Sequence, residues 1–295
     1  LTAMLNPQGR IVGEFSVARA GDDEFFLFGS QAAEVYHSRW FLAHLPAGHA
    51  IRFEVLALSL VGLSVAGPHA RDVLQSATAE SLATADFPFM SFRHVDIGMI
   101  PAWMGRMSYT GDLGYEIWVA PEHQRALFDV LWHAGQPYGM GLFGFRALMA
   151  MRMEKMFGTW YREYRPIYTP LEAGMDRYLK LDHDFVGRAA LEAEMARGPE
   201  RRMVYLAVDP DPDEPADVIG DEPIWHDGEV VGWVTSGAYA HYSGVSLALG
   251  YVPAALASTG AAAAGDLEIE IIGHRRPARL LHEPVLDPSG QRMRE

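Results

Sequence analysis

The chain contains 295 residues, which at the usual prior of roughly 150 residues per domain corresponds to about two domains. Its formal net charge of −14 argues against a nucleic-acid-binding protein, because no basic surface is present to neutralise phosphates. It has no cysteine, which excludes disulfides, thiolate nucleophiles and Cys-ligated metal centres. No uncharged apolar run reaches about 18 residues and no signal-peptide pattern is present, so we expect a soluble, cytoplasmic protein without membrane contacts.

The chain starts at Leu1 with a strand–turn–strand pattern. Residues 6–9 (NPQG) supply the turn, and residues 11–18 alternate as a strand should. A chain that begins inside a hairpin is expected to be a fragment, or a subunit completed by other residues. Glu14 lies on the second strand, where a solvent-facing side chain is the simplest interpretation.

Residues up to about 137 follow an α/β pattern. The expected strands cover residues 24–28, 55–66, 104–109 and 115–119, and the expected helices cover residues 31–45, 69–76 and 121–134. The last two strands flank a glycine turn. Tyr109 and Glu116 stand on either side of this turn, so a phenol and a carboxylate could converge on one pocket. An ordinary hairpin with a packed tyrosine and a solvated glutamate is the alternative.

A strongly apolar helix is expected over residues 141–157. It carries Arg146, Arg152 and Glu154 among leucines, phenylalanines and methionines, and a helix this apolar is expected to be buried. Buried charges need partners or a ligand. Two interpretations therefore stay open: an internal Arg–Glu pair that ties the helix to its neighbours, or a ligand site.

An aromatic and basic loop follows the turn at Gly158, and a further helix is expected over residues 187–197. Flat rings beside charges suit a planar, polar, anionic ligand. The rings and cations of this loop are Trp160, Tyr161, Arg162, Tyr164, Arg165 and Tyr168.

The pattern changes to short strands near residues 198–202. Strands are expected over residues 203–208, 229–235, 247–252, 268–272 and 276–281, which favours a small β-barrel or sandwich. Residues 258–265 (STGAAAAG) are expected to form a loop, and Tyr239 and His241 are placed in another.

Several kinds of site are not supported by the spacing of residues. The twelve histidines show no metal-ligand spacing, so no metal site is expected. Ser64 lacks the G-x-S-x-G context of hydrolases, and the glycines do not match dinucleotide-binding or P-loop spacing. No flavin or nicotinamide domain is expected within these residues.

Seven or more ordered motifs nevertheless resemble one family, the folate-binding aminomethyltransferases or glycine-cleavage T-proteins. They include GPHARDVL, SYTGDLGYEIWV, RMEKMFG, TPLEAGM, DFVGRAAL and GWVTSGAYAHYSGVSLALGYVP. The form GTWYREYRPIY and the ending RRPARLLHEPVLDPSGQRMR look closest to the C-terminal half of dimethylglycine and sarcosine dehydrogenases. The resemblance implies an α+β fold, with a T-protein-like folate-binding α/β part over residues 1–198, its N-terminal portion missing, and a small C-terminal β-barrel over residues 199–295.

The resemblance also assigns roles to residues. Glu14 stands where the family has a catalytic Asp, and Tyr109 is the second residue assigned to catalysis. Glu154 matches the carboxylate that binds the edge of the pterin. The other positions expected to line the folate pocket or hold its rings are Glu116, Arg152, Trp160, Tyr164 and Tyr239.

The implied function is transfer of a methylene, or formaldehyde-level, carbon from an N-methyl amine such as dimethylglycine or sarcosine to tetrahydrofolate. FAD is implied only if an oxidase domain precedes the chain, and the implied partners are a small methylated substrate and an upstream flavin domain or subunit. Two alternatives stay open because Glu14 replaces Asp. They are a tetrahydrofolate-dependent O- or S-demethylase, and a non-catalytic folate-binding module.

Overall fold

The computed structural model describes residues 1–257 and 267–295, so the expected loop over residues 258–265 lies outside the described residues. The chain divides into two compact units, which we call the barrel unit and the sheet unit. In the described part of the chain no helix has the length and apolar character needed to cross a bilayer. The barrel unit comprises Leu1–Val17, Leu27–Gly29 and Met149–Pro288, and the sheet unit comprises Ala18–Phe26, Ser30–Leu148 and Ser289–Glu295.

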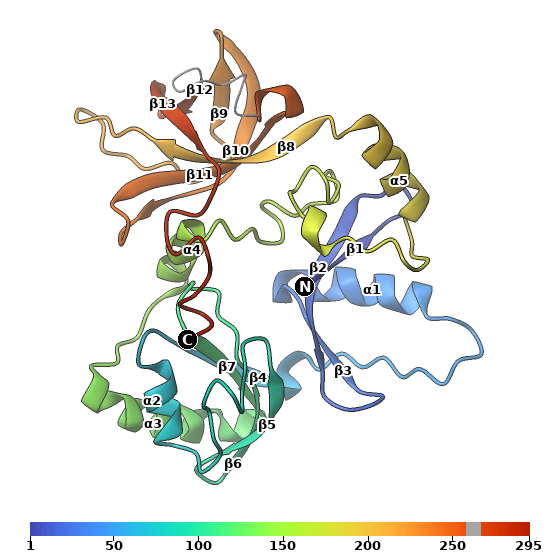
Figure 1. The fold of residues 1–295 in the computed structure, drawn as a ribbon, viewed down its shortest axis with the longest axis vertical. Coiled ribbons are helices and arrows are strands. Elements are labelled where there is room, and N and C mark those ends of the chain that lie inside the picture. Colours follow the sequence, from blue (N-terminus) through green and yellow to red (C-terminus); the bar gives the residue numbers. More distant parts are fainter. Residues whose placement is uncertain (258–266) are drawn as a thin grey trace. The chain divides into compact units, whose positions relative to one another are not determined.

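A closed antiparallel barrel forms the centre of the barrel unit, with strand order β10-β11-β8-β13-β12-β9 (Figure 1). Alternate side chains point inward, and the apolar ones among them, such as Leu206, Val234 and Ile269, are fully buried in one cluster. The expected C-terminal barrel is thus confirmed. Its strands are β8 (Arg201–Val208), β9 (Pro223–His226), β10 (Glu229–Ala240), β11 (Val245–Pro253), β12 (Leu267–Ile271) and β13 (His274–Leu281).

The N-terminal hairpin pairs β1 (Thr2–Leu5) with β2 (Ile11–Arg19), and β3 (Phe25–Phe28) completes this three-stranded sheet. The Asn6 side chain closes the turn by accepting hydrogen bonds from the amides of Gln8 and Arg10, at 3.1 and 2.9 Å. Helix α5 (Arg188–Arg197) starts after Gly187, whose φ is +90°. A Cβ there would lie 2.4 Å from the Asn6 carbonyl oxygen, so only glycine lets the helix start this close to the hairpin.

The sheet unit is built on four antiparallel strands in the order β4-β7-β6-β5. Helix α3 presents Leu127 and Leu131, four residues apart, to one apolar cluster shared with the sheet. Together with the barrel, this arrangement confirms the expected α+β class. The elements are β4 (Val61–Ala66), β5 (Phe92–Ile97), β6 (Ile100–Gly105), β7 (Gly114–Val119), α1 (Glu34–His44), α2 (Ala70–Gln75) and α3 (Gln124–Gly135).

Some expected elements differ in extent. Strand β4 starts at Val61 rather than at residue 55, and β6 ends at Gly105, so Tyr109 lies in the connection to β7 and not on a strand. Strand β10 continues to Ala240, which places Tyr239 on a strand and not in a loop. Hydrogen bonding to β11 extends this strand, and such pairing is not visible in local composition.

The apolar helix is shorter than expected and only partly buried. Helix α4 covers Phe145–Glu154, because Gly141 and Gly144 each disfavour helix by about 1 kcal/mol relative to alanine. Leu142 and Phe145 are 74% and 75% exposed, so the expectation of a buried helix is wrong for its N-terminal half. Burial is confined to Arg152, Met153 and Glu154 at the other end.

Replacement of Leu206 by alanine tests the barrel core. This side chain is completely buried in the barrel cluster, so its truncation should lower the free energy of unfolding by about 2–5 kcal/mol in urea denaturation. The matched control is Val230→Ala on β10, where the side chain is exposed and the change should stay within about 0.5 kcal/mol. Equal effects of the two substitutions would contradict the assigned core.

Candidate active site

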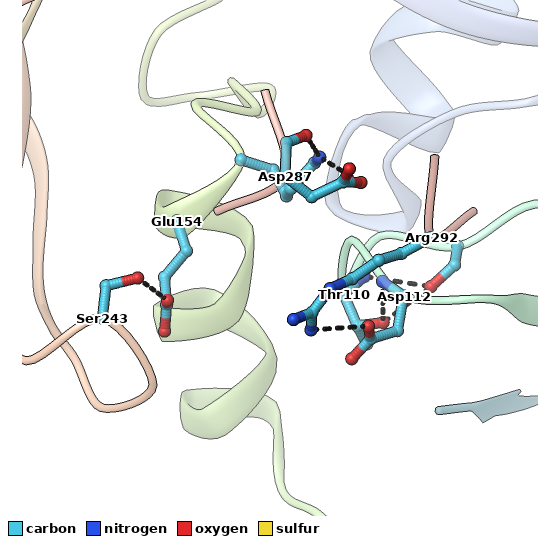
Figure 2. A network of polar contacts seen from close by, with 8 residues as sticks. Thr110, Asp112, Glu154, Ser243, Asp287 and Arg292 are labelled. Carbon is cyan, nitrogen blue, oxygen red and sulfur yellow. Dashed lines mark hydrogen bonds and ion pairs between the residues drawn. The ribbon is translucent and has the colours of Figure 1, made fainter. Parts of the chain in front are cut away.

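The last turn of α4 is fastened to the barrel unit through its carbonyl groups. Tyr205 Oη of β8 donates to the Met153 carbonyl oxygen at 2.8 Å, and the Leu286 amide donates to the Glu154 carbonyl oxygen at 3.1 Å. A helix end leaves such carbonyl groups without partners inside the helix, so these bonds both satisfy and orient it. Lys155 Nζ adds a buried ion pair with Asp287 at 3.2 Å (Figure 2).

Glu154 is bound to the turn between β10 and β11. The Tyr242 amide donates to its Oε1 at 3.2 Å. Ser243 Oγ donates to its Oε2 (Figure 2). The side chain is buried. Each carboxylate oxygen can accept a second hydrogen bond, so the group retains capacity for two donors from a ligand edge.

Arg152 forms the internal ion pair that was one of the two interpretations of this helix. Its Nη1 lies 3.0 Å from Glu163 Oε2, and the two side chains are 1% and 0% exposed. Its guanidinium also donates to the Phe157 carbonyl oxygen at 2.7 Å and to Ser236 Oγ at 2.6 Å. These contacts use Nη1 and Nη2 of Arg152, whereas its buried Nε has no hydrogen-bond partner among the described residues. Its partner Glu163 was not among the residues selected from the sequence, although an acid inside an aromatic loop was a usable signal.

The aromatic loop is a tight, folded turn. Tyr164 N donates to the Thr159 carbonyl oxygen at 3.2 Å, and Trp160 and Tyr164 are joined by a parallel β-bridge. A Cβ on Gly158 would lie 2.5 Å from the Tyr164 ring, so glycine is needed for this ring to fold back. Both Trp160 and Tyr164 are buried, whereas Tyr161 is exposed.

Tyr239 is the expected site residue that the barrel strands carry. It lies on β10, opposite Ser246 of β11, and its ring meets the His241 ring edge-on at 5.1 Å. It is 38% exposed, so this ring presents a face that a ligand can reach.

Glu14 lies on β2, opposite Ala3 of β1, and is half-buried. Burial raises the pKa of its carboxyl from the ordinary 4.5 to about 7, because the charged form loses water. No basic side chain forms an ion pair with it among residues 1–257 and 267–295. A carboxyl that changes its charge near neutral pH is suited to accept and release protons.

Glu116, in the sheet unit, is a second carboxyl whose pKa is raised by burial. It lies on β7 between Ser64 of β4 and Gly105 of β6, and burial raises the pKa of its carboxyl to about 7. Tyr109 is half-buried in the preceding connection.

This connection is braced by a small polar network. Ser108 Oγ and Thr110 Oγ1 share a hydrogen bond of 2.7 Å, and the Asp112 amide donates to Thr110 Oγ1 at 3.3 Å. Arg292 then pairs with Asp112 at 3.3 Å (Figure 2). The sequence did not point to Arg292, which lies 180 residues further along the chain.

The expected site residues thus fall in two groups. Tyr109 and Glu116 belong to the sheet unit, and the others belong to the barrel unit. In the barrel unit, direct contacts join the α4 end to the β10–β11 hairpin and the aromatic loop. No cluster of three or more potential metal ligands occurs where the structure describes the chain. The barrel-unit residues are Glu14, Arg152, Glu154, Trp160, Tyr164 and Tyr239.

Comparison with known proteins identifies the family. The GCVT N-terminal domain matches residues 1–183, and the glycine cleavage T-protein C-terminal barrel domain matches residues 201–287. The chain belongs to the glycine-cleavage T-protein family. The resemblance of the ordered motifs to folate-binding aminomethyltransferases is thereby confirmed.

Two kinds of T-protein relative are similar to the chain. Mitochondrial dimethylglycine dehydrogenase of Homo sapiens is 36% identical over 100% of this chain, but the match covers only 34% of that protein. Aminomethyltransferase of Synechocystis sp. is 34% identical, over 92% of this chain and 71% of that protein. The chain therefore spans about a third of the length of its dehydrogenase relatives.

The T-protein fold is seen in a solved structure as well. Aminomethyltransferase T of the glycine cleavage system from Bartonella henselae superimposes with a TM-score of 0.81 over 97% of this chain and 75% of that chain. At 21% identity, this similarity shows a shared fold.

The raised pKa values of Glu14 and Glu116 predict how stability depends on pH. Both carboxyls are protonated in the folded and unfolded states below about pH 4.5, so burial costs nothing there. Between about pH 4.5 and 7 the folded protein binds more protons than the unfolded chain, and stability should fall as pH rises. Glu14→Gln and Glu116→Gln should each reduce this fall in melting temperature measured from pH 4.5 to 8.

The control for this pH series is Glu122→Gln, which removes an exposed carboxyl and should leave the slope unchanged. Stability that rises with pH over the same interval, or variants that keep the full slope of the parent, would contradict the assignment of the two buried carboxyls.

Proposed function

We propose that the chain transfers a one-carbon unit at the formaldehyde level from an N-methyl amine, of the dimethylglycine or sarcosine type, to tetrahydrofolate. Membership of the aminomethyltransferase family supports a folate-dependent enzyme. The similarity to dimethylglycine dehydrogenase over the entire chain favours an N-methyl amine as the carbon source.

The observation that carries this proposal is the Glu14 carboxyl. It is half-buried, has no ion-pair partner in the described ranges, and has a pKa of about 7. A group with these properties can take a proton from a folate amine as that nitrogen attacks an electrophilic carbon, and can return it to the departing amine or water. Such a base is not required for ligand binding alone.

Glu154 fits the role of pterin-binding residue. The amino-pyrimidinone edge of a pterin offers N–H donors, and each Glu154 oxygen keeps one free acceptor position beside its bond to the β10–β11 turn. In this proposal Glu154 orients the pterin by a bidentate contact, because two parallel hydrogen bonds fix both position and direction.

The other residues in our proposal position the ligand or shield it. Tyr239 supplies an accessible ring for stacking, while Arg152 is paired with Glu163 and the rings of Trp160 and Tyr164 are buried in the loop that carries Glu163. Tyr109 and Glu116 belong to the sheet unit, where the Glu116 carboxyl can donate a hydrogen bond while it is protonated. Exclusion of water protects a formaldehyde-level carbon from hydration.

Tetrahydrofolate supplies the nucleophilic nitrogen that forms the new bond to carbon. The oxidation that generates the electrophile requires a flavin, which we assign to a domain or subunit outside residues 1–295.

We also propose a division between a folate-binding domain over residues 1–198 and a barrel domain over residues 199–295. We propose a cytoplasmic location for the chain, although the human relative is described as mitochondrial.

Substitution of Glu154 tests ligand binding. Glu154→Ala should weaken tetrahydrofolate binding by about tenfold or more in calorimetry, because it removes a charged acceptor pair. Ser243→Ala is the matched control, since it removes the turn's bond to Glu154 and leaves the carboxylate in place. Unchanged tetrahydrofolate affinity in Glu154→Ala, or an equal loss of affinity in Ser243→Ala, would contradict the proposed contact between Glu154 and the pterin.

Substitution of Glu14 tests the chemistry. Glu14→Gln should reduce folate-dependent turnover by about 10²–10⁴-fold, the usual contribution of a general base, while tetrahydrofolate affinity stays nearly constant. In the unmodified protein, turnover should rise with pH through about 7 as the carboxyl ionises. Retained turnover in Glu14→Gln would assign the base to another residue.

The identity of the folate product separates the alternatives. Methylene-tetrahydrofolate formed from an N-methyl amine and an oxidising flavoprotein supports the proposal. Methyl-tetrahydrofolate formed from an aryl ether or thioether supports a demethylase. Binding of tetrahydrofolate without either product supports a non-catalytic module.

A further inference from the structure

Glu163 is a completely buried acidic side chain with hydrogen bonds to both of its carboxylate oxygens, and the proposed chemistry does not use it. Its Oε2 accepts hydrogen bonds from Arg152 Nη1 at 3.0 Å and from the Thr159 amide at 2.9 Å. Its Oε1 lies 2.7 Å from Thr235 Oγ1. The Tyr251 hydroxyl donates to its carbonyl oxygen at 2.8 Å. One residue therefore connects α4, the aromatic loop and two barrel strands.

Strand β10 is irregular at the point where it meets Glu163. Val234 pairs with Gly250 and Ser236 pairs with Leu249, so Thr235 is an extra residue that forms a β-bulge. Bulges turn a side chain out of the regular alternation. Thr235 Oγ1 lies closer to Glu163 than to the Leu249 carbonyl oxygen, at 2.7 against 3.1 Å, so its single proton goes to the carboxylate.

The next residue on β10 binds the other member of the ion pair. Ser236 Oγ accepts a hydrogen bond from Arg152 Nη2 at 2.6 Å. The Arg152–Glu163 pair therefore holds two consecutive residues of β10. Both charges are buried, so loss of either would leave the other buried without a partner. The ion pair therefore holds β10 in place at Thr235 and Ser236.

The same strand reaches the proposed pterin contact a few residues later. Tyr239 follows the bulge on β10, and Tyr242 and Ser243, just beyond its end, hydrogen-bond to Glu154. Arg152 and Glu154 are two residues apart on α4. The helix end and the β10–β11 hairpin are thus joined by two sets of contacts, one around the Arg152–Glu163 pair and one at Glu154.

We propose that Glu163 is a positioning residue for folate binding, acting through the Thr235 bulge and Arg152 on the Glu154 carboxylate and Tyr239. The inference rests on the proposed folate site. Glu163 itself contacts no ligand, and its carboxylate sets the alignment of β10 with the end of α4.

The test uses the full chain and three substitutions. Glu163→Gln removes the charge, Thr235→Val removes only the hydroxyl, and Thr235→Ser keeps it. Calorimetry gives the tetrahydrofolate Kd, thermal melting gives stability, and hydrogen exchange of the Tyr242 amide without ligand reports the bond to Glu154. Asp129→Asn, at an exposed ion pair on α3, is the control for charge removal.

Glu163→Gln is expected to raise the Kd about tenfold and Thr235→Val about threefold, both with faster exchange at the Tyr242 amide. Thr235→Ser and Asp129→Asn should behave like the parent. Should Glu163→Gln fail to fold, Thr235→Val carries the test. A lower melting temperature with unchanged Kd and unchanged exchange would overturn the proposal, because that is the signature of a purely structural role.

The two proposals fail in distinguishable ways. If the parent chain does not bind tetrahydrofolate, the proposed function fails, and exchange at the Tyr242 amide still decides whether Glu163 controls the Glu154 contact. If the parent binds and Thr235→Val binds equally well with unaltered exchange, only the role of Glu163 is rejected.

Discussion

The buried ion pair of Arg152 and Glu163 is the interaction on which the arrangement of the barrel unit's candidate site depends. Removing two charges from water costs several kcal/mol per ion, and the attraction between them offsets this only when hydrogen bonds satisfy the remaining donors and acceptors. Here the Thr159 amide, Thr235 and Ser236 on β10 and the Phe157 carbonyl group supply such hydrogen bonds, and Arg152 Nε is left without a partner in the described part of the chain. The pair is therefore stable only if helix, loop and strand are all in place. This requirement makes the three elements one structural unit, and the Glu154 carboxylate inherits its position from it.

Buried and half-buried glutamates lie in two different environments in this molecule. Glu154 and Glu163 are buried with hydrogen-bond donors aimed at their oxygens. Within residues 1–257 and 267–295 no side chain donates to Glu14 or Glu116, which are half-buried, and burial raises the pKa of both carboxyls to about 7. A site that must hold a polar ligand in one orientation and also move a proton needs both kinds of group. In the proposed function, Glu154 is the fixed carboxylate for recognition and Glu14, in the same unit, is the group that exchanges a proton.

Local features of the sequence predicted the fold better than the site. The hairpin turn at Asn6, helix α5 and most barrel strands follow from turn residues and periodicity, which are short-range properties. The C-terminal end of β10 was not predicted, because its last residues form a strand only through pairing with β11. Helix α4 was predicted too long, because the apolar residues of this segment outweighed Gly141 and Gly144 in the interpretation. An internal Arg–Glu pair was one interpretation of the sequence, but the sequence did not identify Glu163 of the aromatic loop as the acid that pairs with Arg152. Thr235, the bulge residue that binds Glu163, lies 72 residues further along the chain. Trp160 and Tyr164 were interpreted as open stacking surfaces, yet the bonds at Thr159 and the close approach of Gly158 bury them.

In the proposed function, Glu14 differs from the aspartate that the family resemblance implies at this position in the reach of its side chain rather than in its acidity. Aspartate and glutamate have nearly the same intrinsic pKa, and the environment of β2 raises that of Glu14 to about 7 by burial. An additional methylene lengthens the side chain and adds a rotatable bond, so the carboxyl must be held by its surroundings if it is to meet a substrate nitrogen. Burial of the Glu14 side chain on β2 restricts this freedom and also disfavours the charged form. The same desolvation that restrains the longer side chain therefore keeps its protonation equilibrium near neutral pH, where transfer of a proton from an amine costs the least.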